Sequence, residues 1–178
     1  MPKNERVVIV IDGSNFYFGC KNLMGRASID FYKFAVLITG GRKLIRTYYY
    51  NAPLIKNLDE PKYKAQQKFF ERLKNMSYLT LKLGRLVNRN GVYVEKGIDI
   101  NIAVDMLKLA QNNAYDTAIL VSGDGDFVSA VEGVKDLGKH VEQAYFRSGH
   151  SQHLRQACDR YIEITKEALS SCLIAPIT

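Results

Sequence analysis

The chain has 178 residues, of which 47% are hydrophobic and 24% charged, and its formal net charge is +7 at pH 7. This length and composition predict one soluble globular domain that buries a sizeable core. No apolar run approaches the roughly 20 residues that span a bilayer, and the N-terminus lacks the apolar region of a signal peptide. We therefore expect a cytoplasmic protein with no membrane segment.

The cysteine pattern indicates reduced thiols. Cys20, Cys158 and Cys172 are odd in number and have neither CxxC nor zinc-finger spacing. The isoelectric point near 9.3 is suggestive of a polyanionic partner. A basic protein with acids gathered at strand ends would hold a polyanion with its surface and a metal with its site.

The first predicted element is a buried strand, Val7-Val8-Ile9-Val10-Ile11, which runs directly into Asp12-Gly13-Ser14-Asn15. Asn15 is a neutral oxygen donor placed to orient a water or a phosphate, or else an ordinary helix cap. The motif lacks the second aspartate of an aspartyl-phosphate phosphatase, which counts against a covalent phosphoenzyme. Helices are predicted over residues 16–23 and 30–39, and a strand over residues 43–51.

A loop at 52–60 leads into a helix predicted over residues 61–75. Its inward stripe is expected to be Ala65, Phe69, Leu73 and Met76. Another face carries a basic ridge at i, i+4 and i+8, formed by Lys64, Lys68 and Arg72. This ridge is either a solvated face or a nucleic-acid contact.

A strand over 78–82 precedes a hairpin over 84–96, which turns at Asn88-Arg89-Asn90-Gly91. Its basic residues, Arg85, Arg89 and Lys96, suggest a flap that contacts substrate. Lys96-Gly97-Ile98-Asp99 then opens a helix predicted over residues 100–112. Asp99 shares a face with Ala103, Met106, Leu107 and Ala110, so we expect it to point toward the sheet near the strand ends, or simply to cap the helix. Lys96 would neutralise Asp99 or contact phosphate.

A second apolar strand, residues 117–121, ends in Ser122-Gly123-Asp124-Gly125-Asp126 and is followed by a helix over 127–137. Two acids one residue apart repel each other unless a cation lies between them. Carboxylate oxygens suit Mg²⁺ or Mn²⁺. The alternative is that Asp and Gly here are ordinary turn and cap residues.

The remaining elements are a strand over 139–144, a short helix over 152–157 and a strand over 160–164. We assign residues 1–165 to one domain and 166–178 to a terminal helix and tail, which would pack on the domain or on a second copy in a homodimer. The βαβ alternation predicts a Rossmann-like α/β/α sandwich with a mostly parallel central sheet.

Three acidic positions, Asp12, Asp99 and the Asp124/Asp126 pair, should meet at one edge of this sheet. No Ser-His-Asp set, catalytic Cys-His pair, Walker loop or GxGxxG is evident. An acid cluster without a nucleophile suits hydrolysis assisted by one or two metal ions.

At these residues the sequence resembles the NYN domain of the LabA-like group, which is related to PIN-domain nucleases. The resemblance covers residues 6–165 and is carried by three ordered motifs: Ile11-Asp12-Gly13-Ser14-Asn15, Lys96-Gly97-Ile98-Asp99 and Val121-Ser122-Gly123-Asp124-Gly125-Asp126-Phe127.

The resemblance implies a PIN-like fold and a ribonuclease site dependent on Mg²⁺ or Mn²⁺. The implied metal-binding acids are Asp12, Asp99, Asp124 and Asp126, with Asn15 and Ser122 as polar helpers. We expect single-stranded RNA as substrate, contacted by Ser122 and by the basic residues Lys64, Lys68, Arg85, Arg89 and Lys96. The alternatives are a non-catalytic RNA-binding or regulatory module that keeps the metal pocket, and a small-molecule phosphohydrolase.

Overall fold

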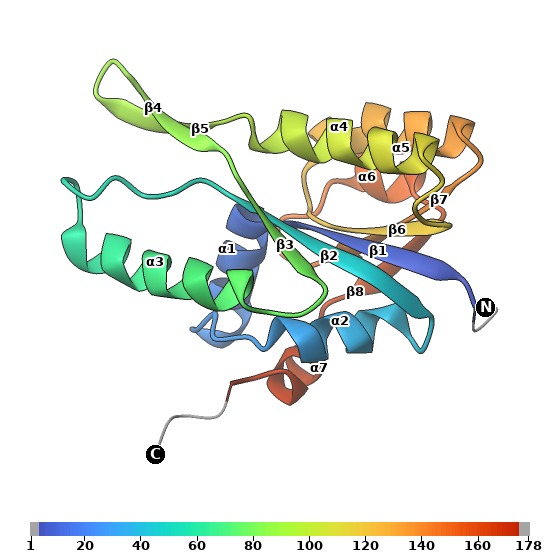
Figure 1. Cartoon of the computed structure of the whole chain (residues 1–178), viewed down its shortest axis with the longest axis horizontal. Helices are drawn as coiled ribbons and strands as arrows, with labels where there is room; N and C mark the ends of the chain where they lie inside the picture. The colour runs from blue at the N-terminus through green and yellow to red at the C-terminus, as the bar shows by residue number, and fades with distance from the viewer. Residues whose placement is uncertain (1–3, 175–178) are drawn as a thin grey trace.

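The computed structural model describes residues 4–174 (Figure 1). Its centre is a six-stranded sheet in which every neighbouring pair is parallel. The strands are β1 (Arg6–Asp12), β2 (Lys43–Asn51), β3 (Leu79–Leu83), β6 (Thr117–Val121), β7 (His140–Tyr145) and β8 (Arg160–Glu163).

The strand order is β3-β2-β1-β6-β7-β8. Counting only these six strands along the chain, it is the 3-2-1-4-5-6 order of doubly wound folds. The direction of winding reverses between β1 and β6. In open parallel sheets the crevice outside the carboxyl ends at this reversal is where ligands bind.

Helices cover both faces of the sheet, giving the predicted three-layer α/β/α sandwich (Figure 1). One layer contains α1 (Gly13–Met24), α2 (Phe31–Thr39), α3 (Glu60–Lys74) and α7 (Lys166–Ser171). The other contains α4 (Ile98–Gln111), the short 3-10 helix η1 (Gly125–Phe127), α5 (Val128–Asp136) and α6 (Gln152–Ala157). Among the described residues, none of these helices is long and apolar enough to cross a membrane.

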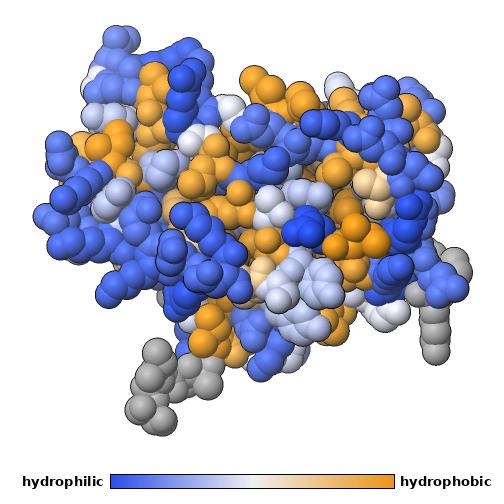
Figure 2. Space-filling view, viewed as in Figure 1, coloured by the Kyte–Doolittle hydropathy of each residue, from blue (hydrophilic) through white to orange (hydrophobic). Residues whose placement is uncertain are grey.

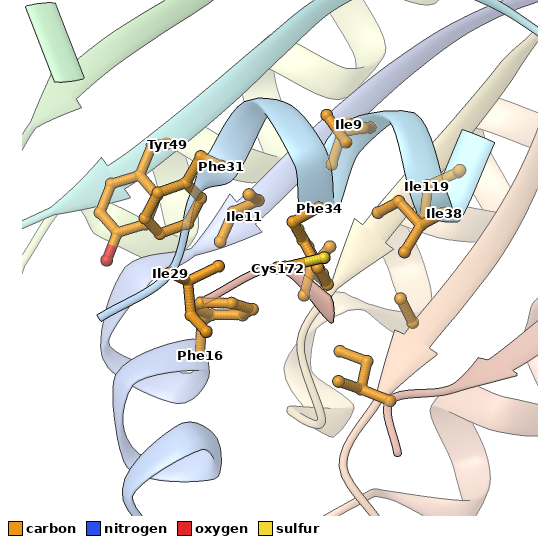
Figure 3. Close-up of a cluster of buried hydrophobic side chains, with 14 of the residues drawn as sticks. Ile9, Ile11, Phe16, Ile29, Phe31, Phe34, Ile38, Tyr49, Ile119 and Cys172 are labelled. Atoms are coloured by element: carbon orange, nitrogen blue, oxygen red, sulfur yellow. The ribbon is translucent and has the colours of Figure 1, made fainter. Parts of the chain in front are cut away.

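The core under α1 and α2 is built from aromatic rings on a floor of branched strand residues (Figure 3). The ring of Phe16 lies 5.3 Å from that of Phe31 and 5.1 Å from that of Phe34, in the tilted geometry that aromatic pairs favour. Ile9 and Ile11 of β1 are fully buried beneath them. This packing fixes the start of α1, and hence the direction in which the chain leaves β1.

A buried ion pair crosses the sheet on the same face. The guanidinium of Arg42 donates to both carboxylate oxygens of Glu142 at 2.8 Å, and its Nε donates to the carbonyl of Thr39, also at 2.8 Å. Arg42 is 8% exposed and Glu142 2%. The pair therefore ties the segment before β2 to β7 without contact with bulk water.

The hairpin lies outside the main sheet and projects from the body (Figure 1). Its antiparallel strands are β4 (Arg85–Arg89) and β5 (Val92–Lys96). The predicted hairpin is therefore confirmed.

The predicted fold class is confirmed, and each predicted helix and strand is present. β2, β6 and α6 have the predicted bounds, and the ends of the other elements are shifted. The largest shift is in α1, which begins at Gly13 rather than Phe16 because Asp12 caps it. The terminal helix ends at Ser171, and residues 175–178 of that prediction lie outside the described residues.

The predicted inward stripe of α3 is wrong at one position. Ala65 is exposed, and Phe70 and Leu73 are the buried residues of this helix. Gln66 lies on the covered side instead, because its amide accepts from the N–H of Leu54 and donates to the carbonyl of Ala52.

Candidate active site

The carboxyl end of β1 delivers Asp12 into a nearly closed environment. Its side chain is the N-cap of α1 and accepts from the N–H of Asn15 at 3.1 Å. Its second oxygen accepts from the hydroxyl of Ser122 at 3.2 Å. Asp12 is 7% exposed, so this carboxylate is oriented on both oxygens and largely shielded from water.

The carboxyl end of β6 is tied to β1 through Asn15 and Ser122. The side-chain oxygen of Asn15 accepts from the N–H of Gly123 at 3.2 Å, and the Ser122 hydroxyl accepts from the N–H of Asp124 at 3.2 Å. Asp12, not Asn15, is the helix cap, so the capping alternative for Asn15 is wrong. Asn15 and Ser122 hold the two strand ends in one register.

The Asp124/Asp126 pair lies in the turn that follows. Asp124 caps η1, and one of its oxygens accepts from the N–H of Asp126 at 3.0 Å. The capping alternative therefore describes the local role of Asp124. It does not account for Asp126, which is exposed and whose side chain caps neither η1 nor α5.

Asp99 reaches the same edge from the first turn of α4, but not from the predicted face. The helix begins at Ile98, and its buried residues are Ile98, Ile102, Met106 and Ala110. Asp99 is one position away from this face and is exposed. The expectation that it points toward the sheet from the buried stripe is therefore wrong, and it lies at the rim.

The carboxylates act on one another electrostatically. Burial raises the pKa of Asp12 to about 6, against the lowering effect of the hydrogen bonds from Asn15 and Ser122, and the charges on Asp99 and Glu95 raise it further. The pKa of Asp99 is also raised, first by partial desolvation of its carboxylate at the edge of the protein and then by the charges of Asp124 and Asp126. Asp99 thus couples the two acidic strand ends.

No lysine or arginine neutralises this cluster within residues 4–174, since none of the ion pairs there includes Asp12, Asp99, Asp124 or Asp126. Carboxylates that repel one another without a counter-charge fit a hard divalent cation chemically. In the same span, no three His, Cys, Asp or Glu side chains are grouped so that they could hold a metal ion. The four carboxylates therefore fit a divalent cation by their chemistry, but their side chains are spread along the carboxyl edge of the sheet.

Two residues at the site lie outside the sequence motifs and could not be identified from them. Glu95 on β5 accepts from the hydroxyl of Ser14 at 2.8 Å and contributes to the pKa of Asp12. Gln143 on β7, fully buried, donates to the carbonyl of Ser122 at 3.0 Å. Glu95 is thus a fifth carboxylate near the cluster, and Gln143 holds the start of the turn after β6 through the carbonyl of Ser122.

The hairpin presents its cations on the side away from Glu95. Arg85 pairs across the hairpin with Lys96, and Arg89 pairs with Val92, so these side chains share one face. Glu95 shares the other face with Leu86, which packs against the core under α4. The basic residues therefore lie on the face of the hairpin opposite the one that carries Glu95 and packs against the core.

The ridge on α3 is exposed. Lys64 pairs with Glu60 at 2.9 Å, and Lys68 is exposed beside it. Figure 2 shows the surface of α3 as predominantly hydrophilic. Lys64 and Lys68 therefore lie on a solvated face. Among the described residues, no hydrogen bond or ion pair joins them to the acid cluster at the strand ends.

Gly123→Ala is expected to destabilise the protein by about 2–3 kcal/mol and to displace Asp124. A Cβ at this position would collide with the carbonyl oxygen of Gly149, which is backbone and cannot rotate away. Urea unfolding of the variant measures the loss.

Gly133→Ala on α5 is the matched control. Its Cβ would meet only the tip of Leu107, and alanine favours the helix. Equal stabilities of the two variants would contradict the close approach of residues 123 and 149.

Three comparisons with known proteins bear on the family and the fold. The NYN domain matches residues 6–165. The Low amplitude and bright protein LabA of Synechococcus elongatus is 29% identical over 170 residues, covering 90% of this chain and 84% of that protein. The crystal structure of a protein of unknown function from Vibrio parahaemolyticus superposes with a TM-score of 0.75 at 24% identity, covering 94% of this chain and 97% of that one, which supports the fold.

Proposed function

The chain belongs to the NYN domain family, and from that membership and the geometry of the acid cluster we propose that it is a metal-dependent endoribonuclease acting on single-stranded RNA. The observation that carries the proposal is the set of carboxylates at the ends of β1, β6 and the start of α4. The charge of Asp99 raises the pKa of Asp12, the charges of Asp124 and Asp126 raise the pKa of Asp99, and none of the four has a cationic partner among residues 4–174. The formal net charge of +7 supports a polyanionic substrate.

In this proposal Asp12, Asp99, Asp124 and Asp126 hold one or two Mg²⁺ or Mn²⁺ ions, which supply an activated water and stabilise charge at phosphorus. The protein's own contribution is orientation. Asn15 and Ser122 fix both oxygens of Asp12 and lock the β1 and β6 ends together. Gln143 holds the backbone of Ser122 in place.

The test is a gel assay of purified protein on labelled single-stranded RNA, in EDTA, Mg²⁺ or Mn²⁺, with Asp124→Asn alongside. We expect cleavage that requires metal and is lost in the variant. Asparagine keeps the cap, so the loss would report the missing charge rather than misfolding. RNA that is shifted but intact in every condition would reject the nuclease and identify a non-catalytic RNA-binding module.

Charge reversal on the hairpin separates a polymer substrate from a small phosphate ester. Arg85→Glu with Arg89→Glu is expected to lower RNA cleavage about tenfold and to reduce its salt dependence, because fewer phosphates are contacted. Hydrolysis of bis(p-nitrophenyl) phosphate should be unchanged.

Lys64→Glu with Lys68→Glu is the comparison pair on α3, with a smaller expected loss because Lys64 is already paired with Glu60. If neither double variant affects RNA cleavage, a small-molecule phosphohydrolase becomes the better account.

A further inference from the structure

An arginine lies stacked on two tyrosines on the face of the sheet covered by α6, near the β8 edge. The guanidinium carbon of Arg155 lies 4.0 Å from the ring centroid of Tyr161 and 5.8 Å from that of Tyr145. Tyr145 ends β7 and is buried, whereas Tyr161, on the edge strand β8, is 53% exposed. An aromatic ring open to solvent therefore carries a planar cation against it.

This stack is connected to the turn that bears Asp124. The N–H of Ser151 donates to the carbonyl of Gly123 at 2.8 Å, which holds the segment after β7 against the acidic turn. Next to Ser151, the imidazole of His150 lies 5.0 Å from the ring of Tyr145, and that ring lies 6.5 Å from Tyr161. A row of rings thus leads from the segment beside the acidic turn to the exposed side of Tyr161.

Among the described residues the cations along this row form no ion pair, and Glu163 acts on Arg155 through its charge alone. Within residues 4–174, no ion pair includes Arg155 or the exposed Arg147. Arg155, on α6, is held by the ring faces of Tyr145 and Tyr161 and by the side chain of Tyr161. Exposed aromatic rings combined with unpaired guanidinium groups are what single-stranded nucleic acids stack on.

We propose that Tyr161 and Arg155 form a stacking site for an unpaired base of the RNA strand, with Arg147 against a phosphate between that base and the acid cluster. The inference rests on the proposed RNA substrate. It also explains why the protein would prefer single-stranded RNA to a duplex. A base within a duplex has no free face to offer a tyrosine, whereas an unpaired base does.

The chain contains no tryptophan, so Tyr161→Trp creates a single fluorescent reporter at the site. In EDTA, where metal-dependent cleavage is prevented, we expect oligo(A) to quench its emission saturably. An abasic oligonucleotide of the same length should bind through its phosphates and leave the emission unchanged. Tyr32→Trp is the matched control, because Tyr32 is 52% exposed but lies on α2, on the opposite face of the sheet.

Tyr161→Leu, which keeps apolar bulk and removes the ring, is expected to weaken oligo(A) binding about tenfold and abasic binding hardly at all. Tyr32→Leu should leave both affinities unchanged. Equal quenching by oligo(A) and the abasic strand, or no quenching by either, would overturn the stacking site. Quenching that follows protein concentration rather than RNA would also overturn it, and would indicate a second copy on the β8 edge.

These outcomes are independent of the catalytic proposal. If the wild-type protein cleaves RNA but oligo(A) does not quench the Tyr161→Trp variant, the stacking site is wrong and the nuclease stands. If oligo(A) quenches that variant and no condition gives cleavage by the wild type, the stacking site stands and the nuclease fails.

Discussion

Asp12→Asn is expected to abolish metal-dependent cleavage while making the metal-free protein more stable. The two effects share one cause, the negative charge held on a side chain that is only 7% exposed. Asparagine keeps the shape, can still accept from the N–H of Asn15, and caps a helix as well as aspartate does. At neutral pH the metal-free variant should gain about 1–3 kcal/mol, because the folded protein no longer holds a poorly solvated carboxylate.

The raised pKa of Asp12 determines the direction in which the stability of the folded protein changes with pH. The pKa of Asp12 is raised in the folded state to about 6 from an ordinary value of 3.8. A raised carboxyl pKa means that the folded state binds the proton more tightly. The stability it contributes is fully present below 3.8 and is lost as the pH rises through about 6. The wild type should therefore gain stability relative to Asp12→Asn as the pH falls through this window.

Thermal unfolding of both proteins in EDTA across that pH range measures the difference, since every other titrating group is common to the two. Adding Mn²⁺ should then reverse their order at neutral pH. A metal at 100 times its dissociation constant stabilises the folded state by about 2.7 kcal/mol, and Asp12→Asn would lose most of that gain. Parallel pH profiles for the two proteins would contradict the buried-charge account of Asp12.

The second large effect is expected at the opposite end of the sheet. Arg42→Met should destabilise the protein by about 3–5 kcal/mol, because it leaves the carboxylate of Glu142 buried without its two 2.8 Å hydrogen bonds. Urea unfolding measures this loss. Because the pair lies at the amino ends of the strands, metal affinity of the folded variant should be unchanged.

The double variant Arg42→Met/Glu142→Met is the control for this prediction. Removing both charges should recover much of the loss, because β7 then holds no unpaired carboxylate, and the remaining loss reflects Glu5, which loses its 3.4 Å contact with Arg42. If the double variant is as unstable as the sum of its single changes, the two residues are not coupled as the geometry indicates.

The acid cluster could be predicted from sequence because its two halves follow one rule. Asp12 and Asp124 each follow an apolar run closely, and the carboxyl ends of adjacent parallel strands coincide. The structure brings these strand ends together through Ser122, whose hydroxyl contacts both the Asp12 carboxylate and the Asp124 N–H. This rule needs only the local pattern of an apolar run followed by an acid and the right-handed crossover between parallel strands, and the sequence indicates both.

The parts that could not be predicted depend on contacts distant in sequence or on polar side chains in covered positions. Ser14 and Glu95 are 81 residues apart and meet only because the hairpin folds back toward α1. Gln66 takes an inward place on α3 because it satisfies loop backbone groups, which no hydrophobic pattern reveals. On α4, Gly97 adopts a left-handed conformation with φ of 84° and starts the helix at Ile98, which moves Asp99 off the buried face.

The central claim is that the acids at the β1, β6 and α4 ends bind a divalent metal, and calorimetric titration of Mn²⁺ tests it most directly. We expect saturable binding to the wild-type protein and binding at least about tenfold weaker to Asp124→Asn. Asp136→Asn, which changes an exposed acid at the end of α5, is the matched control and should bind as the wild type does. Equal Mn²⁺ affinity in all three proteins, or none in the wild type, would contradict the account.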